Sequence, residues 1–204
     1  MMEKIHWLGH AGFFIDAPSA EIYIDPYQIR KIYPQADIVL VTHDHFDHLS
    51  LEDIKKIAKT DTIIVGPVAI KGRIDYTTQI LNPGEKINLK DVVIEGVSAY
   101  NLRKSFHPKD NGYLGFVITV EKKRIYHAGD TDFIPEMRNI KADIVLLPVG
   151  GTYTMDAQEA AEAANAINPQ IAIPMHWGSI VGSRKDAEEF KRLCKNEVRI
   201  LEKE

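Results

Sequence analysis

The pattern of apolar and polar positions predicts short strands alternating with helices along most of the chain. Apolar runs of four to eight residues, bounded by polar or turn-forming residues, are typical of strands. Such runs predict strands at residues 4–8, 13–16, 21–24, 37–41, 62–65, 86–89, 92–99, 114–120, 123–127, 143–147, 171–175 and 198–201.

Three helices are expected between or after these strands. Ser50 can cap a helix over residues 51–59, and Asp156 can cap a second helix that runs to about Ile167. A third helix is expected to begin near Ser183. Each capping side chain can accept a hydrogen bond from a free N–H group of the first turn. Strands alternating with helices predict an α/β fold.

The order of these elements contains a weak internal repeat. The matching positions are Ile22 and Ile125, Asp37 and Asp143, and Ile63 and Ile171. The offsets of 103, 106 and 108 residues preserve both order and approximate spacing. Two similar ββαβ-like halves packed face to face would produce this pattern, and so would a chance likeness among apolar strands. Because no linker interrupts the chain, we expect a single domain over residues 1–204.

The composition indicates which classes of binding partner are not expected. The chain has 204 residues, of which 45% are hydrophobic, and a net charge of −4, so it can bury one core but offers no basic field for nucleic acid. No apolar run reaches the roughly 20 residues that cross a bilayer. The N-terminal stretch lacks a signal-like apolar segment, and Cys194 is the single cysteine. We therefore expect a cytoplasmic protein with no membrane partner. A homo-oligomer is left open.

The strongest chemical signal comes after the predicted strand at residues 37–41. There His43, His45, Asp47 and His48 form an H-x-H-x-D-H pattern within six positions. With 8 histidines in 204 residues, such a match arises by chance on the order of once in a thousand chains. In a turn, two imidazoles can converge on one ion while the Asp-His pair reaches a second. These ligand types suit zinc, and also manganese or iron.

Further ligands are expected where other strands end. His107 lies in a polar loop, His127 ends a predicted strand, Asp130 lies three residues further on, and His176 ends the strand at 171–175. Spacing alone does not distinguish His107 from His127 as a ligand.

These residues resemble the central motifs of the metallo-β-lactamase fold superfamily, over essentially the whole chain. That resemblance implies a four-layer αββα sandwich, with two mixed sheets face to face and helices outside. It favours His107 over His127 and implies two metal ions. The implied ligands are His43, His45 and His107 for one ion, Asp47, His48 and His176 for the other, and Asp130 as the bridge.

Other details resemble the UlaG-like, UPF0173-type branch of that superfamily. They are the segments Trp7-Leu-Gly-His10, Tyr126-His127-Ala-Gly-Asp130 and Pro148-Val-Gly-Gly. The branch is described as metal-dependent hydrolases, and one member type opens the lactone of a phosphorylated sugar acid. The resemblance therefore implies a metal-dependent hydrolase of lactonase or phosphodiesterase type.

The implied chemistry is attack by hydroxide, generated between two divalent ions, on an ester, lactone or phosphodiester. Asp47 is expected to hold the nucleophile, and His127 is the candidate proton donor. Arg103 and Lys104 lie near His107, which suggests a small anionic substrate, although a solvated loop is an equal interpretation. Asn101 is expected in the pocket wall, or else in packing.

Several alternatives stay open. His10 could face the site or lie in a surface turn, and Asp25 could orient a ligand histidine or form an ordinary Asp-Pro turn. A flavo-di-iron oxidoreductase is disfavoured, because it would need a flavin domain and a glutamate in place of His45. A nuclease of the same superfamily would be expected to have an inserted RNA-binding arm or an extra nuclease domain, and this acidic chain of 204 residues offers neither. A non-enzymatic metal-binding or regulatory module is the other interpretation.

Overall fold

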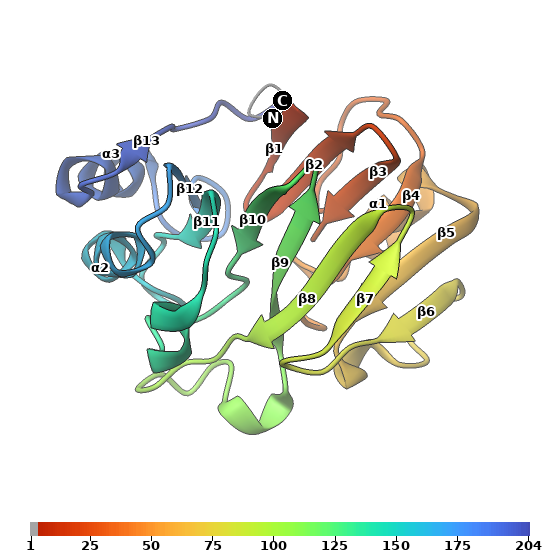
Figure 1. Ribbon diagram of the computed structural model, residues 1–204, viewed down its shortest axis with the longest axis horizontal. Helices are drawn as coiled ribbons and strands as arrows, with labels where there is room; N and C mark the ends of the chain where they lie inside the picture. The colour runs from red at the N-terminus through yellow and green to blue at the C-terminus, as the bar shows by residue number, and fades with distance from the viewer. Residues whose placement is uncertain (1–3) are drawn as a thin grey trace.

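The computed structural model describes residues 4–204, which form two sheets packed face to face (Figure 1). The strands of the first sheet are β1 (Ile5–Gly9), β2 (Gly12–Ala17), β3 (Ala20–Ile24), β4 (Ala36–Leu40), β5 (Ala58–Gly66) and β6 (Thr77–Ile80). Those of the second are β7 (Lys86–Leu89), β8 (Val92–Ser98), β9 (Leu114–Val120), β10 (Lys123–His127), β11 (Ile144–Pro148), β12 (Ile171–Met175) and β13 (Glu197–Val198). The α-helices are α1 (Leu51–Ile57), α2 (Ala157–Ile167) and α3 (Arg184–Leu193), and short 3₁₀ helices cover Val68–Ile70, Lys109–Asn111 and Pro135–Asn139.

Both sheets are mixed, and they have the same plan. In the first, β1-β2-β3 pair antiparallel and β3-β4-β5-β6 pair parallel. In the second, β7-β8-β9-β10 pair antiparallel and β10-β11-β12-β13 pair parallel. The sequence repeat is therefore a repeat of topology and not a chance likeness.

Side chains alternate between two apolar layers, as a strand's period of two requires. Ile38 and Leu40 of β4 point into the core shared by the two sheets, while Val39 points outward beneath α1. Helices α2 and α3 lie against β11 and β12 on the outer side of the second sheet (Figure 1). The two sheets with helices outside match the predicted sandwich.

Most predicted elements agree with the structure within a few residues, and the differences have physical causes. The sequence pattern does not predict β6, because its residues Thr-Thr-Gln-Ile are polar and half exposed at a sheet edge. Helix α1 ends at Ile57, two residues early, because β5 begins at Ala58. Cys194 is the C-cap residue of α3, and burial raises the pKa of its thiol to about 12. That shift is opposite to what a reactive thiolate needs.

Across residues 4–204, no helix combines the length and apolar character required to cross a bilayer.

Candidate metal centre

The histidine-rich loop after β4 is fixed to the end of β3. Asp25 donates its N–H to the carbonyl of Leu40 at 2.9 Å, and its Oδ1 accepts the N–H of Thr42 at 2.8 Å. His48 N donates to His45 O at 3.0 Å, which closes the loop into a turn. The backbone path therefore turns several imidazoles towards the same edge of the sandwich.

The second half of the chain brings its residues to the same place. Asp130 lies after β10, His176 lies after β12, and His107 lies in the loop between β8 and β9. His176 N donates to His10 O at 2.8 Å, which ties β12 to the β1–β2 turn. Carboxyl ends of parallel strands gather at one sheet edge, which is why sites form there.

A left-handed backbone recurs around this edge. His10, Asp25, His107 and His176 have φ values of 52°, 44°, 54° and 60°. Such conformations cost non-glycine residues of order 1–3 kcal/mol and persist where the surroundings impose them. The strained positions here coincide with polar side chains directed at one cluster.

The first group of potential ligands is His43, His45 and His107. His43 Nε2 lies 3.0 Å from His45 Nδ1, and His107 Nε2 lies 3.2 Å from the same atom. Two nitrogens that are each about 2.05 Å from a tetrahedral ion lie about 3.3 Å apart. The three imidazoles therefore converge as ligands of one ion do.

The second group is His10, Asp47, His48 and His176, whose ligand atoms lie within 4.8 Å of one another. His10 Nε2 contacts Asp47 Oδ2 at 2.9 Å, and the His10 ring lies against the His176 ring with centroids 3.9 Å apart. His10 thus belongs to the cluster and not to an open surface turn. Its place beside two glycines in a turn was a sequence signal, but one that could not show where the ring points.

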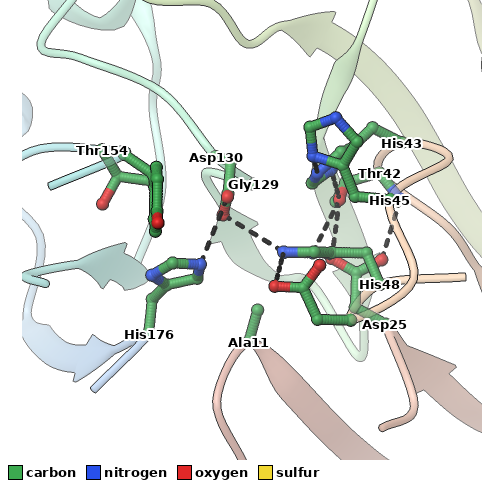
Figure 2. Close-up of polar contacts among 12 residues, drawn as sticks. Ala11, Asp25, Thr42, His43, His45, His48, Gly129, Asp130, Thr154 and His176 are labelled. Atoms are coloured by element: carbon green, nitrogen blue, oxygen red, sulfur yellow. Dashed lines mark hydrogen bonds and ion pairs between the residues drawn. The ribbon is translucent and has the colours of Figure 1, made fainter. Parts of the chain in front are cut away.

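Asp130 lies between the two groups, as Figure 2 shows for His48 and His176. Its Oδ1 is 3.4 Å from His48 Nε2, and its Oδ2 is 3.4 Å from His107 Nε2 and 3.2 Å from His176 Nε2. One carboxylate therefore faces imidazoles from both groups, which is the position of a bridge.

A second carboxylate holds the cluster from behind. Asp25 Oδ2 contacts His48 Nδ1 at 2.8 Å and accepts the Thr42 hydroxyl at 2.6 Å. Thr42 Oγ1 in turn lies 2.9 Å from His43 Nδ1 (Figure 2). Outer partners of this kind fix the tautomer and orientation of metal-binding histidines. Of the two interpretations of Asp25, the structure supports the orienting role.

The donor set fits divalent cations. His48 Nε2, Asp130 Oδ1 and His176 Nε2 are buried and have no hydrogen-bond partner within residues 4–204. Buried polar atoms normally have partners, and these three face one another across the cluster. Imidazole nitrogens with carboxylate oxygens suit zinc and, equally, manganese or iron.

Charge within the cluster is unevenly distributed. Burial works to raise the pKa of Asp130, but His176 and His48 outweigh it and hold that pKa well below its ordinary value. Burial, together with His48, holds the pKa of His43 well below its ordinary value. Asp130 is thus ionised and His43 neutral, the protonation states that bind a cation. Burial works to lower the pKa of His48, but Asp130 and Asp25 outweigh it and hold that pKa well above its ordinary value.

The cluster opens into a cavity of about 440 Å³. Its walls are Asp44, His45, Phe46, Asp47, Phe106, His107, Asp130, Tyr153, His176 and Ile180. Members of both groups thus line one opening, so a small molecule in the cavity would lie directly over the cluster.

The prediction that His127 donates a proton to the substrate is wrong. It is buried, its Nε2 donates to the carbonyl of Ala11 at 2.8 Å, and its Nδ1 accepts the N–H of Gly129 at 3.1 Å. Both ring nitrogens are thus used by the backbone, and the ring cannot exchange a proton with a substrate. His107, and not His127, reaches the cluster.

The structure does not support the predicted substrate-binding residues Arg103, Lys104 and Asn101, because none of the three lines the cavity. The Lys104 ammonium forms an ion pair with Asp132. Arg103, Lys104 and Asp132 line a separate depression. Asn101 Nδ2 donates to the carbonyls of Phe106 at 2.9 Å and Tyr153 at 2.8 Å. Asn101 therefore shapes the loop that carries His107, as the packing alternative allowed.

Comparison with known proteins decides the family. A model of the beta-lactamase superfamily domain matches residues 4–176. The chain belongs to this superfamily. It is 40% identical to a UPF0173 metal-dependent hydrolase of Thermoplasma acidophilum, over 94% of this chain and 90% of that protein. It is 35% identical to another of Pyrobaculum arsenaticum, over 92% and 90%. The predicted UPF0173-type branch is thereby confirmed.

Solved structures agree with this placement. A Parabacteroides distasonis protein superposes with a TM-score of 0.88 at 32% identity, covering 97% of this chain and 93% of its own. A metallo hydrolase of Ignicoccus hospitalis superposes with a TM-score of 0.79 at 26% identity, covering 97% and 94%. The metallo-β-lactamase sandwich predicted from the sequence is therefore confirmed.

Proposed function

We propose that this protein is a hydrolase that uses two divalent ions, zinc in the first instance, to cleave an ester, lactone or phosphodiester. The observation that carries the proposal is a pair of ligand groups facing one carboxylate, Asp130, beneath an open cavity. Relatives named metal-dependent hydrolases support it.

The chemistry that two such ions supply is acidification of a water molecule and polarisation of a substrate oxygen. Side chains of the protein orient the water and transfer protons. Asp47 lines the cavity and is held by His10, so it is placed to orient the attacking water and accept its proton. The proton that Asp47 accepts from the water can then pass to the leaving group, and Tyr153, which has the only hydroxyl among the described residues that line the cavity, can donate a hydrogen bond there.

The position of the scissile bond is inferred from the charges around the cavity. Within residues 4–204 no lysine or arginine lines it, so negative charge on a small anionic substrate would meet only the bound ions. We therefore place the reacting carbonyl or phosphoryl group at the floor, beside Asp130 and His45, and the rest of the substrate towards the mouth.

A turnover assay with metal analysis tests the function. Protein loaded with zinc, manganese or iron is assayed on bis-p-nitrophenyl phosphate and a panel of lactones and aryl esters, alongside His48→Ala. We expect two ions per wild-type chain and turnover that His48→Ala abolishes, since His48 lies between Asp25 and Asp130.

The matched control is His6→Ala. His6 is a histidine of β1 that contacts Glu204, outside the cluster, so its loss should leave metal content and turnover unchanged. Binding of two ions without turnover on any substrate would refute the enzymatic proposal and favour a metal-binding module. Binding of a single ion would refute the dinuclear centre.

A further inference from the structure

The mouth of the cavity carries large apolar side chains that remain exposed. Phe46, Phe106 and Ile180 are 69%, 46% and 41% exposed, and all three line the cavity. Only seven large hydrophobic residues are exposed within residues 4–204, so three of them gather at one opening. We call these three side chains the apolar rim. Contiguous apolar surface at a cleft is a common mark of ligand binding.

Each rim residue is attached to a loop that also carries a candidate ligand. Phe46 stands between His45 and Asp47, Phe106 directly precedes His107, and Ile180 lies four residues after His176. The backbone of each loop is therefore positioned by the cluster. The rim residues therefore lie in the same loops as the candidate ligands, next to the cluster at the cavity.

Local packing supports the rim without covering it. The Phe106 ring meets the Tyr153 ring edge-on, with centroids 4.7 Å apart, and the Phe46 ring meets Tyr27 edge-on at 6.0 Å. Phe46 and Phe106 nonetheless stay well exposed, so part of each ring is open to a molecule that enters the cavity.

Charges around the cavity favour an apolar group over an additional anionic one. The lining drawn from residues 4–204 holds Asp44, Asp47 and Asp130 and no lysine or arginine. Asp44 pairs with Arg73 at 2.7 Å and accepts the Tyr113 hydroxyl at 2.9 Å. An anionic group at the rim would thus meet apolar carbon and carboxylates, without a partner.

We propose that the substrate has an apolar alkyl, acyl or aryl group next to its scissile bond, and that this group packs on Phe46, Phe106 and Ile180. This inference rests on the proposed function for the position of the scissile bond. A second copy of the chain covering the same side chains is the competing occupant.

Binding of alkyl hydroxamates tests the inference independently of turnover, because a hydroxamate chelates metal ions and carries an alkyl chain of chosen length. Isothermal titration of the metal-loaded protein with hydroxamates of two to eight carbons measures affinity against chain length. Full burial of a methylene corresponds to about a fourfold gain in affinity, and half burial to about twofold. We expect a gain of twofold to fourfold per methylene over the first four or five carbons.

Substitutions in the apolar rim show which side chains produce the dependence of affinity on chain length. Phe46→Ser and Phe106→Ser should flatten the dependence on chain length while leaving the affinity of the two-carbon hydroxamate unchanged. The matched control is Ile32→Ser, because Ile32 is 102% exposed and lies outside the cavity lining. Ile32→Ser should keep the full dependence.

The outcomes separate the inference from the function. A dependence on chain length without turnover on any substrate would support the apolar rim while refuting hydrolysis. Equal affinity at every chain length, or no binding at all, would overturn the inference. A rim variant that changes the oligomeric state in light scattering, with no dependence on chain length in the wild type, would assign the rim to self-association instead.

Discussion

The two halves of the molecule have the same strand register but use their loops differently. Ile22 pairs with Ile38 in the first half as Ile125 pairs with Ile144 in the second. Ile38 likewise pairs with Ile63, and Ile144 with Ile171. The repeated scaffold thus extends to individual residue pairs, and the chemistry depends on the loop at the end of each strand.

Two pairs of residues lie at equivalent places in the two halves. His10 lies in the β1–β2 turn and His107 in the equivalent β8–β9 loop, both with a left-handed backbone, and each belongs to a different ligand group. Asp25 lies after β3, and Asp130 lies after the equivalent β10. Asp25 supports His48 from behind, whereas Asp130 faces both groups.

The largest asymmetry is at the ends of β4 and β11. The β4 loop carries four candidate ligands, but the β11 loop, within the described part of the chain, carries none and passes through Gly150. A Cβ on Gly150 would lie 2.5 Å from the carbonyl oxygen of His176. One loop thus supplies side chains, while the other supplies the space that lets His176 reach the cluster.

Among substitutions that test the difference between the halves, Asp130→Asn should have the largest effect. Because Asp130 faces both groups, we expect both ions to bind more weakly and turnover to fall by more than the roughly 100-fold that loss of an outer partner costs. Metal content by mass spectrometry and turnover measure the effect. Asp110→Asn, an exposed carboxylate, is the control. Retention of two tightly bound ions would refute the bridging position.

A smaller effect is expected at the counterpart, Asp25. Asp25→Ala leaves His48 Nδ1 and the Thr42 hydroxyl without their acceptor, so metal affinity should fall by roughly 10–100-fold. Competition with a chromophoric chelator measures the affinity, with Asp16→Ala of β2 as an exposed control. Unchanged affinity, in a variant that circular dichroism shows to be folded, would contradict the orienting role.

The smallest effect concerns two equivalent aspartates at the start of parallel strands. Asp37 and Asp143 each accept a backbone N–H, from Glu21 and Arg124. Partial burial works to raise the pKa of Asp37, but Lys59 and Lys90 outweigh it and lower that pKa to about 2. Stability from this group is complete above the unfolded pKa of about 3.9 and is lost as pH falls towards 2.

Asp37→Asn should therefore lose about 1–2 kcal/mol of unfolding free energy at pH 6, with the lysines partly screened by solvent, and almost none near pH 2. Urea unfolding of metal-free protein at pH 6, 4 and 2 measures this. Asp143→Asn is the matched comparison and should lose less, because Asp143 pairs with a single lysine, Lys123 at 3.3 Å, within residues 4–204. An equal loss for Asp37→Asn at all three pH values would contradict the electrostatic origin.

Sequence reasoning agreed with the structure where the place of a residue depends on the course of the backbone. Apolar runs located the strands, and ligands at their ends could be paired because strand ends converge. It failed for Lys104, whose direction is set by Asp132, 28 residues further along the chain. It also failed for His127, because the carbonyl of Ala11 lies 116 residues away. Partners at such separations depend on sheet packing, which local patterns do not contain.

The division of ligands between the halves also bears on how the protein is made. The first group is complete only once His107 has been synthesised, and the second only once His176 has. A nascent chain that ends between them can hold the three imidazoles of one group but not the full second group. The proposed centre would therefore be completed in the order of synthesis, the first group before the second, and a chain truncated before β12 would lack His176.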